Sequence, residues 1–208
     1  MNILENYYQK VIRYDLINKF SYAHLSEVPR LKKIILNFGC KSFEIKNIAS
    51  ALFSLELITM KQGSLTKAQR PSILLKVRKG NVTGCLVVLQ KGLMYSFLLK
   101  FLTEVLPNLK DSQSLNISNK LDKTCFSFTV KDLISFKELE KQFYLFINLP
   151  PLNITLITNT KSTKELVYLL RSFKLPIVQA IVTQLVECNL AKVKVEGSNP
   201  FVCFLTKN

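Results

Sequence analysis

The succession of helical and strand-like patterns constrains the fold of this chain more than any other feature of its sequence. Apolar residues recur at helical spacing in residues 3–19, 45–53, 92–106 and 166–173. Short apolar or alternating runs, which are typical of strands, occupy residues 31–38, 72–78, 83–90, 126–130 and 152–158. Adjacent strands with helices between them predict the α+β class, with an antiparallel or mixed sheet and helices packed on one face. The other face would then be free for a partner.

An extended basic β-hairpin completes this expected fold. Lys-Gly-Asn at residues 79–81 predicts a hairpin turn between residues 72–78 and a returning strand at residues 83–90. Side chains alternate along the first of these strands, so Lys76 and Arg78 share one side. The opposite, apolar side would consist of Ile73, Leu75 and Val77.

Charge is distributed unevenly along the chain. From Met60 to Gly92 there are seven Lys and Arg residues and no Asp or Glu. The whole chain of 208 residues carries a formal net charge of +15, but 48% of its residues are hydrophobic, which argues against disorder. A globular core with a basic surface favours nucleic acid or an anionic membrane as the partner. The alternative for the hairpin is an edge strand protected from aggregation by its cations.

Membrane insertion and catalysis have little support. No stretch of about 18 uncharged apolar residues occurs, and the N-terminus lacks the apolar core of a secretory signal. Phosphate-binding and nucleophile motifs are missing, and Asp132, Glu138 and Glu140 fall in a mixed-charge segment typical of a solvated face. His24 has no apparent catalytic partner, which favours a structural role. We therefore expect a protein that is not an enzyme.

The cysteines do not form a metal-binding pattern. Their number is odd, their spacing is wide, and no CxxC pair occurs among Cys40, Cys85, Cys125, Cys188 and Cys203. Buried thiols in a reducing compartment are the favoured interpretation, and we expect no metal and no cofactor.

Four tyrosines near the N-terminus leave two interpretations open. Tyr7, Tyr8, Tyr14 and Tyr22 could stack on nucleic-acid bases. Residues at helical spacing are more often part of a core, and that interpretation is favoured. The expected apolar face of the first helix is Ile3, Tyr7, Val11, Tyr14 and Ile17 or Ile12.

The order of motifs resembles a known family. "YYQKVIRYDLINKFSYAHLSEVPRLKKIILNFG" at residues 7–39 resembles the opening of the ribosomal protein five family of the large subunit. "LTKAQRPSILLKVRKGNVTGCLVVLQ" at residues 65–90 is similar to the family's hairpin. "FSFTVKDLISFKELE" and "LNITLITNTKSTKELVYLLRSFKLPI" are similar to its later segments. The match runs in order from about Tyr7 to Ile177.

The resemblance implies an α+β protein in the central protuberance of the large ribosomal subunit. Its sheet would hold 5S rRNA and large-subunit rRNA, and its hairpin loop would reach toward peptidyl-site tRNA and a small-subunit bridge protein, without a membrane partner. The implied rRNA-binding residues are Arg30, Lys32, Asn37, Lys61, Gln62, Thr66, Lys67 and Gln90. The implied tRNA-facing loop comprises Arg70, Ser72, Leu75, Lys76, Arg78 and Lys79. An extraribosomal RNA-binding or RNA-chaperone domain is the alternative.

Departures from the family pattern indicate an organellar member. "MKQG" replaces the family's "GQKP", so Lys61 takes the place of the glutamine and Gln62 follows it. Val88 and Gln90 replace a threonine and an arginine on the face expected to contact RNA. Such drift fits a mitochondrial protein of the matrix better than a plastid or bacterial one.

The family-like domain is expected to span residues 1–177, followed by an extension at residues 178–208 that has no counterpart in the family. The spacing of Val178, Ile181, Val182 and Leu185 is that of an ordinary amphipathic helix. One reverse translation of residues 183–200 also resembles parts of a transfer RNA gene, a hypothesis that the codons of the gene would decide.

Overall fold

The computed structural model describes residues 2–40, 45–73, 77–109, 115–117, 122–146 and 149–175. These residues form a six-stranded sheet in the order β2-β3-β1-β6-β5-β4, and every neighbouring pair is antiparallel. The strands are β1 (Leu31–Gly39), β2 (Ser64–Lys67), β3 (Val82–Leu89), β4 (Leu115–Ile117), β5 (Cys125–Val130) and β6 (Leu152–Thr158). The predicted α+β class is confirmed, and the sheet is antiparallel rather than mixed.

Strand β1 lies in the middle of the sheet and sets its register. Asn37 of β1 faces Leu86 of β3 on one side and Asn153 of β6 on the other. Burial alternates along β1, β5 and β6, because successive side chains of a strand point to opposite faces. One face is therefore almost entirely apolar, with Thr158 as a buried polar residue, and the other is mixed.

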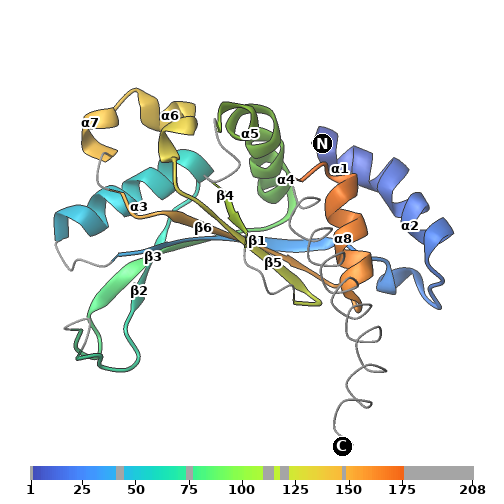
Figure 1. Cartoon of the computed structure of the whole chain (residues 1–208), viewed down its shortest axis with the longest axis horizontal. Coiled ribbons are helices and arrows are strands. Elements are labelled where there is room, and N and C mark those ends of the chain that lie inside the picture. Colours follow the sequence, from blue (N-terminus) through green and yellow to red (C-terminus); the bar gives the residue numbers. More distant parts are fainter. Residues whose placement is uncertain are drawn as a thin grey trace, which may run out of the picture.

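The helical segments of the described chain are α1 (Ile3–Tyr7), the π-helix Tyr8–Ile12, α2 (Arg13–Lys19), the 3₁₀ helix Leu25–Glu27, α3 (Ile45–Thr59), α4 (Lys91–Lys100), the π-helix Phe101–Val105, α5 (Leu106–Asn108), the 3₁₀ helix Leu133–Ser135, α6 (Lys137–Glu140), α7 (Phe143–Phe146) and α8 (Thr163–Ser172). Figure 1 shows α3 to α7 on the same side of the sheet, with α1, α2 and α8 grouped at one end. The prediction that helices pack on one face is confirmed.

The core lies between this helical layer and the apolar face of the sheet. Ile34, Leu36 and Phe38 of β1 are fully buried there. The last helix, α8, begins at Ser162, whose hydroxyl accepts a hydrogen bond from the Glu165 amide at 3.3 Å and satisfies one free N–H of its first turn. Burying each large apolar side chain of the core contributes about 1.5–3 kcal/mol, so the core holds the sheet against the helices.

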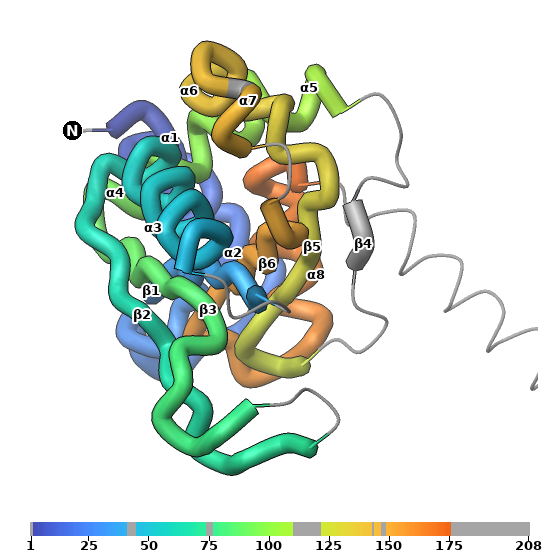
Figure 2. The backbone as a smooth tube through the Cα atoms, turned by 90° about the vertical axis from the view of Figure 1, so that its left-hand side faces the viewer, coloured from blue at the N-terminus to red at the C-terminus, as the bar shows by residue number. Residues whose placement is uncertain are grey.

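The outer ends of strands β2 and β3, which do not pair with β1, extend beyond the body of the molecule as an arm, which we define as residues 67–73 and 77–83. Figure 2 shows the arm leading away from the layered core. The predicted pairing of residues 72–78 with β3 is wrong, because β3 lies between β2 and β1 and pairs with these two strands. The turn at residues 79–81 does form, with the Asn81 amide donating to the Arg78 carbonyl at 3.2 Å. It leads back toward Ala68 rather than into a strand at residues 72–78.

The apolar side that was predicted for residues 72–78, formed by Ile73, Leu75 and Val77, is also not found as predicted. Ser72 and Val77 form an isolated bridge, and Val77 is buried, but Ile73 is 95% exposed. Leu75 lies outside the described residues. The expected apolar stripe is therefore wrong at Ile73, since a single bridge does not give the segment a sheet to lie on.

The first helix follows its predicted range, residues 3–19, but faces the other way. Of the expected apolar face, only Ile12, the alternative to Ile17, is buried; the others are exposed by at least a third: Ile3, Tyr7, Val11, Tyr14 and Ile17. Ile12 and Leu16 are the residues that are fully buried. Strand β4 (Leu115–Ile117) lies outside every segment in which a strand was predicted.

Candidate nucleic-acid interface

The face of the sheet away from the helices is the largest surface of mixed polarity that the described strands present. We call it the open face, and its side chains are Lys33, Ile35, Asn37, Ser64, Thr66, Leu86, Val88, Cys125, Ser127, Thr129, Asn153, Thr155 and Ile157. Each of them is half-buried or exposed, and none is Asp or Glu. Among the described helices, none covers this face (Figure 1).

Acidic side chains gather in the helical layer instead. In the described part of the chain, the ion pairs are Lys100–Glu138 at 2.5 Å, Lys137–Glu104 at 3.8 Å and Lys161–Glu27 at 2.6 Å. All three carboxylates belong to helical segments. The two sides of the molecule therefore differ in charge, and the cations around the open face have no carboxylate on that face to neutralise them.

Asn37 lies at the centre of this surface. Its side chain is half-buried between the β3 and β6 neighbours, and it has no hydrogen-bond partner within the described residues. An amide carries donors and an acceptor in one plane, so an unpaired amide on a sheet can bind a base or a ribose. Neighbouring polar groups are already paired, since the Thr129 hydroxyl donates to the Asn153 side chain at 2.8 Å.

Five of the predicted rRNA-binding residues surround the arm side of the open face. Thr66 and Lys67 belong to β2, where Thr66 is half-buried opposite Gly84 and Lys67 is exposed. Lys61 and Gln62 are exposed just before β2, and the Lys61 ammonium donates to the Val88 carbonyl at 2.5 Å. Gln90 is exposed and directly follows the last residue of β3.

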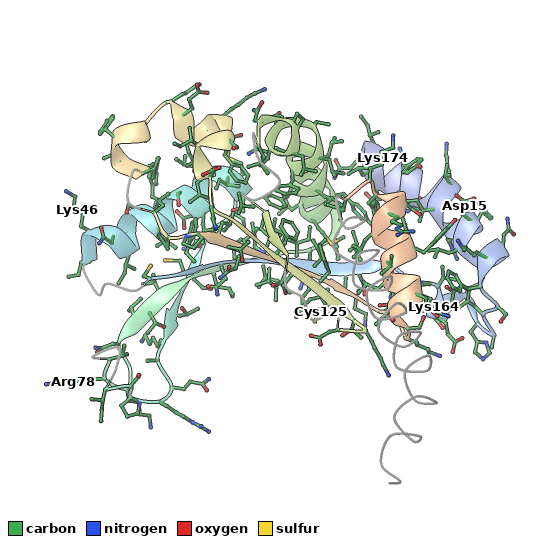
Figure 3. The ribbon with its side chains drawn as sticks, viewed as in Figure 1. Asp15, Lys46, Arg78, Cys125, Lys164 and Lys174 are labelled. Carbon is green, nitrogen blue, oxygen red and sulfur yellow. The ribbon has the colours of Figure 1, made fainter. Side chains whose placement is uncertain are left out.

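The loop of the arm presents cations and no carboxylate among its described residues. Arg70, Arg78 and Lys79 are exposed and Ser72 is half-buried. Figure 3 shows Arg78 on the arm, away from the body. The other two predicted loop residues, Leu75 and Lys76, lie outside the described residues.

Arg30 and Lys32 are not brought together with Asn37. They lie at the opposite end of β1, seven and five residues away, which is roughly 23 and 16 Å at about 3.3 Å per residue. Lys32 is exposed at the irregular register between Leu31 and Lys33. Arg30 lines a hollow beside the first helix.

The four tyrosines divide between the two interpretations. Tyr7 and Tyr14 are exposed, at 39% and 61%. Tyr8 is half-buried, stacks on Phe173 with ring centroids 6.3 Å apart and donates its hydroxyl to the Pro29 carbonyl. Tyr22 is also half-buried, and burial raises its pKa to about 12. Two tyrosines thus support the core and two are available for stacking.

The structure also places the residues that the sequence analysis considered for catalysis or metal binding. Glu138 is bound to Lys100, whereas Asp132, Glu140 and His24 are exposed. Cys85 is buried, and its pKa is raised to about 11 by burial and by Cys40 beside it. Within the described residues, no three His, Cys, Asp or Glu side chains gather as metal ligands, and no helix is long and apolar enough to span a membrane.

Sequence reasoning missed the part of the open face contributed by β5 and β6. The polar residues concerned are Ser127, Thr129, Asn153 and Thr155. Their alternation with buried neighbours in "CFSFTV" and "LNITLIT" was the available signal. The strand order, which places β5 beside β6 and β6 beside β1, is what adds them to the surface around Asn37.

Within the described residues, a sheet face that no helix covers lies next to an arm that carries exposed cations, an arrangement that fits the class of proteins that bind an extended anionic partner. Comparison with known proteins agrees with this class. Residues 82–177 match the family model for the C-terminus of the ribosomal L5 family. The large ribosomal subunit protein uL5m of Reclinomonas americana is 36% identical over 179 residues, which is 85% of this chain and 98% of that protein.

Bacterial proteins match over a similar range. The large ribosomal subunit protein uL5 of Mycoplasma pneumoniae is 32% identical over 181 residues, covering 86% of this chain and 99% of that protein. The uL5 of Nitrosomonas europaea is 32% identical over 175 residues, 83% of this chain and 97% of that protein. This chain belongs to the uL5 family of large-subunit ribosomal proteins.

Proposed function

We propose that this protein is a structural constituent of an organellar large ribosomal subunit, in which its open face binds 5S rRNA and large-subunit rRNA in the central protuberance. The observation that carries the proposal is the open face itself: its side chains include no Asp or Glu, and the Asn37 amide at its centre has no partner among the residues that the structure describes. Its family relatives are large-subunit ribosomal proteins, one of them mitochondrial. No catalytic step is part of the proposed role.

The arm has a different role in this proposal. Its exposed cations, Arg70, Arg78 and Lys79, reach toward peptidyl-site tRNA and a small-subunit bridge protein. Because these residues lie on a projecting loop, they can contact a partner without moving the open face. The division between an anchoring face and a reaching arm explains why the cations of the arm are separated from the sheet surface.

A mitochondrial location is proposed from the departures in the motifs. Lys61, Gln62, Val88 and Gln90 stand where the family pattern has other residues, and three of them border the open face. A thinned contact with 5S rRNA fits a ribosome whose RNA or protein composition has changed. The relative from Reclinomonas americana supports this location, although the bacterial relatives are nearly as similar.

Cosedimentation at high salt tests the proposal. Organelle lysate is centrifuged through sucrose at increasing salt, and this protein is quantified in the large-subunit fraction. Binding through phosphates alone weakens steeply with salt, with a slope of about 0.9 per phosphate contact in the logarithmic plot. An integral subunit should remain with the particle at about 0.5 M salt. Release into the free fraction would favour an extraribosomal RNA-binding protein.

A further inference from the structure

A hollow of about 500 Å³ lies beside the first helix, away from the open face. We call it the tyrosine–arginine hollow, and its defining residues are Tyr8, Lys10, Arg13, Tyr14, Ser26 and Arg30. Ligand pockets in proteins commonly enclose about 300–1,000 Å³. The hollow is therefore large enough for one nucleotide and too small for a helical stem.

Positive charge converges on the hollow without a compensating carboxylate in its lining. Burial raises the pKa of Tyr8, and the charges of Arg13 and Arg30 act in the opposite direction, so both guanidinium groups lie near this phenol. Neither arginine takes part in an ion pair within the described part of the chain. Glu27, which follows Ser26, is bound to Lys161. The lining thus has unused capacity for an anion.

The wall of the hollow is held in place from two sides. From the helix, the Tyr8 hydroxyl donates to the Pro29 carbonyl at 2.8 Å. From the end of β6, the Asn159 side chain accepts from the Arg30 amide at 2.6 Å and donates to the Val28 carbonyl at 3.2 Å. These contacts fix the backbone of residues 28–30, so the point from which the Arg30 side chain extends is set before any ligand arrives, which lowers the entropic cost of binding.

Tyr14 supplies an aromatic surface at the edge of the hollow. Its side chain is 61% exposed although it belongs to a packed helix. Proteins bind single-stranded nucleic acids with cationic side chains that contact the phosphate backbone and with aromatic side chains on which the bases stack. Arg13, Arg30 and Lys10 provide the first requirement and Tyr14 the second, within one concave surface.

The hollow is separate from the proposed contact around Asn37. Arg30 directly precedes β1 and lies seven residues before Asn37, roughly 23 Å away at about 3.3 Å per residue. A single nucleotide cannot reach both positions. Any RNA in the hollow is therefore a second segment, or a distant part of the same strand.

We propose that the tyrosine–arginine hollow binds one unpaired nucleotide of an RNA, with its phosphate between Arg13 and Arg30 and its base stacked on Tyr14. This inference rests on the proposed RNA-binding function and adds a second contact to it. The protein would then hold RNA at two points, on the open face and beside the first helix. Lys10, at the edge of the hollow, contacts the neighbouring phosphate.

The test measures binding of the full chain to a fluorescein-labelled single-stranded RNA of about ten nucleotides, by anisotropy at constant salt. Removing two charges from the hollow by Arg13→Gln with Arg30→Gln should weaken binding by about tenfold or more. The matched control, Lys46→Gln with Lys141→Gln, removes two exposed cations elsewhere and should change affinity by less than about twofold. Figure 3 shows Lys46 at the other end of the molecule from α2.

A second pair of variants tests the base contact with little risk to folding, because Tyr14 is exposed. Tyr14→Ala should weaken binding by about fivefold or more, whereas Tyr14→Phe, which keeps the ring, should bind as the unaltered chain does. A 4-thiouridine version of the RNA should crosslink to the peptide that contains Tyr14. Thermal melting of each variant shows whether the fold is intact.

The outcomes separate this inference from the proposed function. If the unaltered chain joins large subunits and binds RNA, but the Arg13/Arg30 and Tyr14→Ala variants bind equally well, the inference is overturned and the function stands. Normal RNA affinity with lost incorporation of these variants would assign the hollow to a protein partner and would also overturn it. Failure of the unaltered chain to remain with large subunits would instead reject the proposed function.

Discussion

Gly84 determines how closely β3 can approach the middle of the sheet. A Cβ atom at this position would lie 2.1 Å from the Phe38 carbonyl oxygen and 3.1 Å from the Thr66 hydroxyl. The Phe38 oxygen is a backbone atom of the adjacent strand β1, so it cannot move without disturbing the ladder, whereas the Thr66 hydroxyl can rotate away. A side chain at residue 84 would therefore separate β3 from β1 at the base of the arm.

We expect Gly84→Ala to lower the free energy of unfolding by about 1–3 kcal/mol, as overpacking of a well-ordered interior does. Urea denaturation followed by circular dichroism measures this change. Gly39→Ala is the matched control, because nothing lies within 4 Å of a Cβ at that strand end. Equal stability of the two variants would contradict the proposed steric role of Gly84.

Asn37 is expected to affect binding rather than folding. Its amide has no partner among the described residues, so Asn37→Ala leaves no buried group unsatisfied and should change the free energy of unfolding by less than about 0.5 kcal/mol. Binding to 5S rRNA should weaken by about 1–3 kcal/mol if the amide makes a specific base contact. Filter binding at constant salt measures the affinity. Unchanged affinity would show that this position has lost the role found in the family motif.

At the scale of single residues, motif matching located Asn37 and Arg30 but could not separate them. The two residues are close together in the sequence. Only the fold shows that Arg30 lines the hollow beside the first helix, whereas Asn37 lies on the open face. The tyrosines illustrate a second limit. The first helix has apolar residues on two faces, including Ile12 and Leu16 as well as Tyr7 and Tyr14, so helical spacing alone cannot choose the buried one.

At the scale of elements, the strands with an alternating apolar pattern were predictable and the edge strands were not. "CFSFTV" and "LNITLIT" alternate because one face is buried, and they form β5 and β6. "SLTK" has no such pattern, and it becomes β2 because the neighbouring β3 offers free hydrogen-bonding groups. The apolar spacing of residues 72–78 therefore predicted a strand in the wrong place, next to a turn that does form.

The arm is expected to act as a reaching element rather than as an anchor. Reversing the charge of Arg78 and Lys79 should leave the fold intact, because both side chains are exposed. Assembly into the large subunit should survive, while peptidyl-site tRNA occupancy and translation decrease. Each phosphate contact that is lost should reduce the logarithmic salt slope of tRNA binding by about 0.9.

Reconstituted large subunits carrying the charge-reversed arm provide the measurement. The control is Lys164→Glu, an exposed cation on α8 at the opposite end of the molecule (Figure 3). Loss of assembly with normal folding would make the arm an anchor. Normal tRNA occupancy and translation in assembled subunits would mean that the cations only protect an edge strand from aggregation.

At the scale of the whole molecule, separate faces carry separate properties. The helical layer contains the described ion pairs, the open face lacks acids, and the arm carries cations away from the body. Net charge and hydrophobic content, both available from the sequence, predicted a globular basic protein. They could not predict which face would be basic, since that depends on the strand order β2-β3-β1-β6-β5-β4.

The extension at residues 178–208 is expected to be dispensable for folding. The described core ends with Phe173, which stacks on Tyr8, and with Leu175, which is 2% exposed. Deleting residues 180–208 should therefore shift the melting temperature by less than about 3 °C, which is about 1 kcal/mol for a chain of this size. Incorporation into the large subunit should also be retained.

A longer deletion serves as the control that should unfold the protein. Removing residues 163–208 also removes α8, whose Leu166, Leu169 and Leu170 are fully buried. Each lost leucine should cost about 2–5 kcal/mol, and their sum of about 6–15 kcal/mol is as large as the whole stability of an ordinary domain, so this truncated chain should not fold. Circular dichroism and size-exclusion chromatography compare the two truncations. If the shorter deletion unfolds the protein as the longer one does, the extension is part of the domain, and the boundary at residue 177 is wrong.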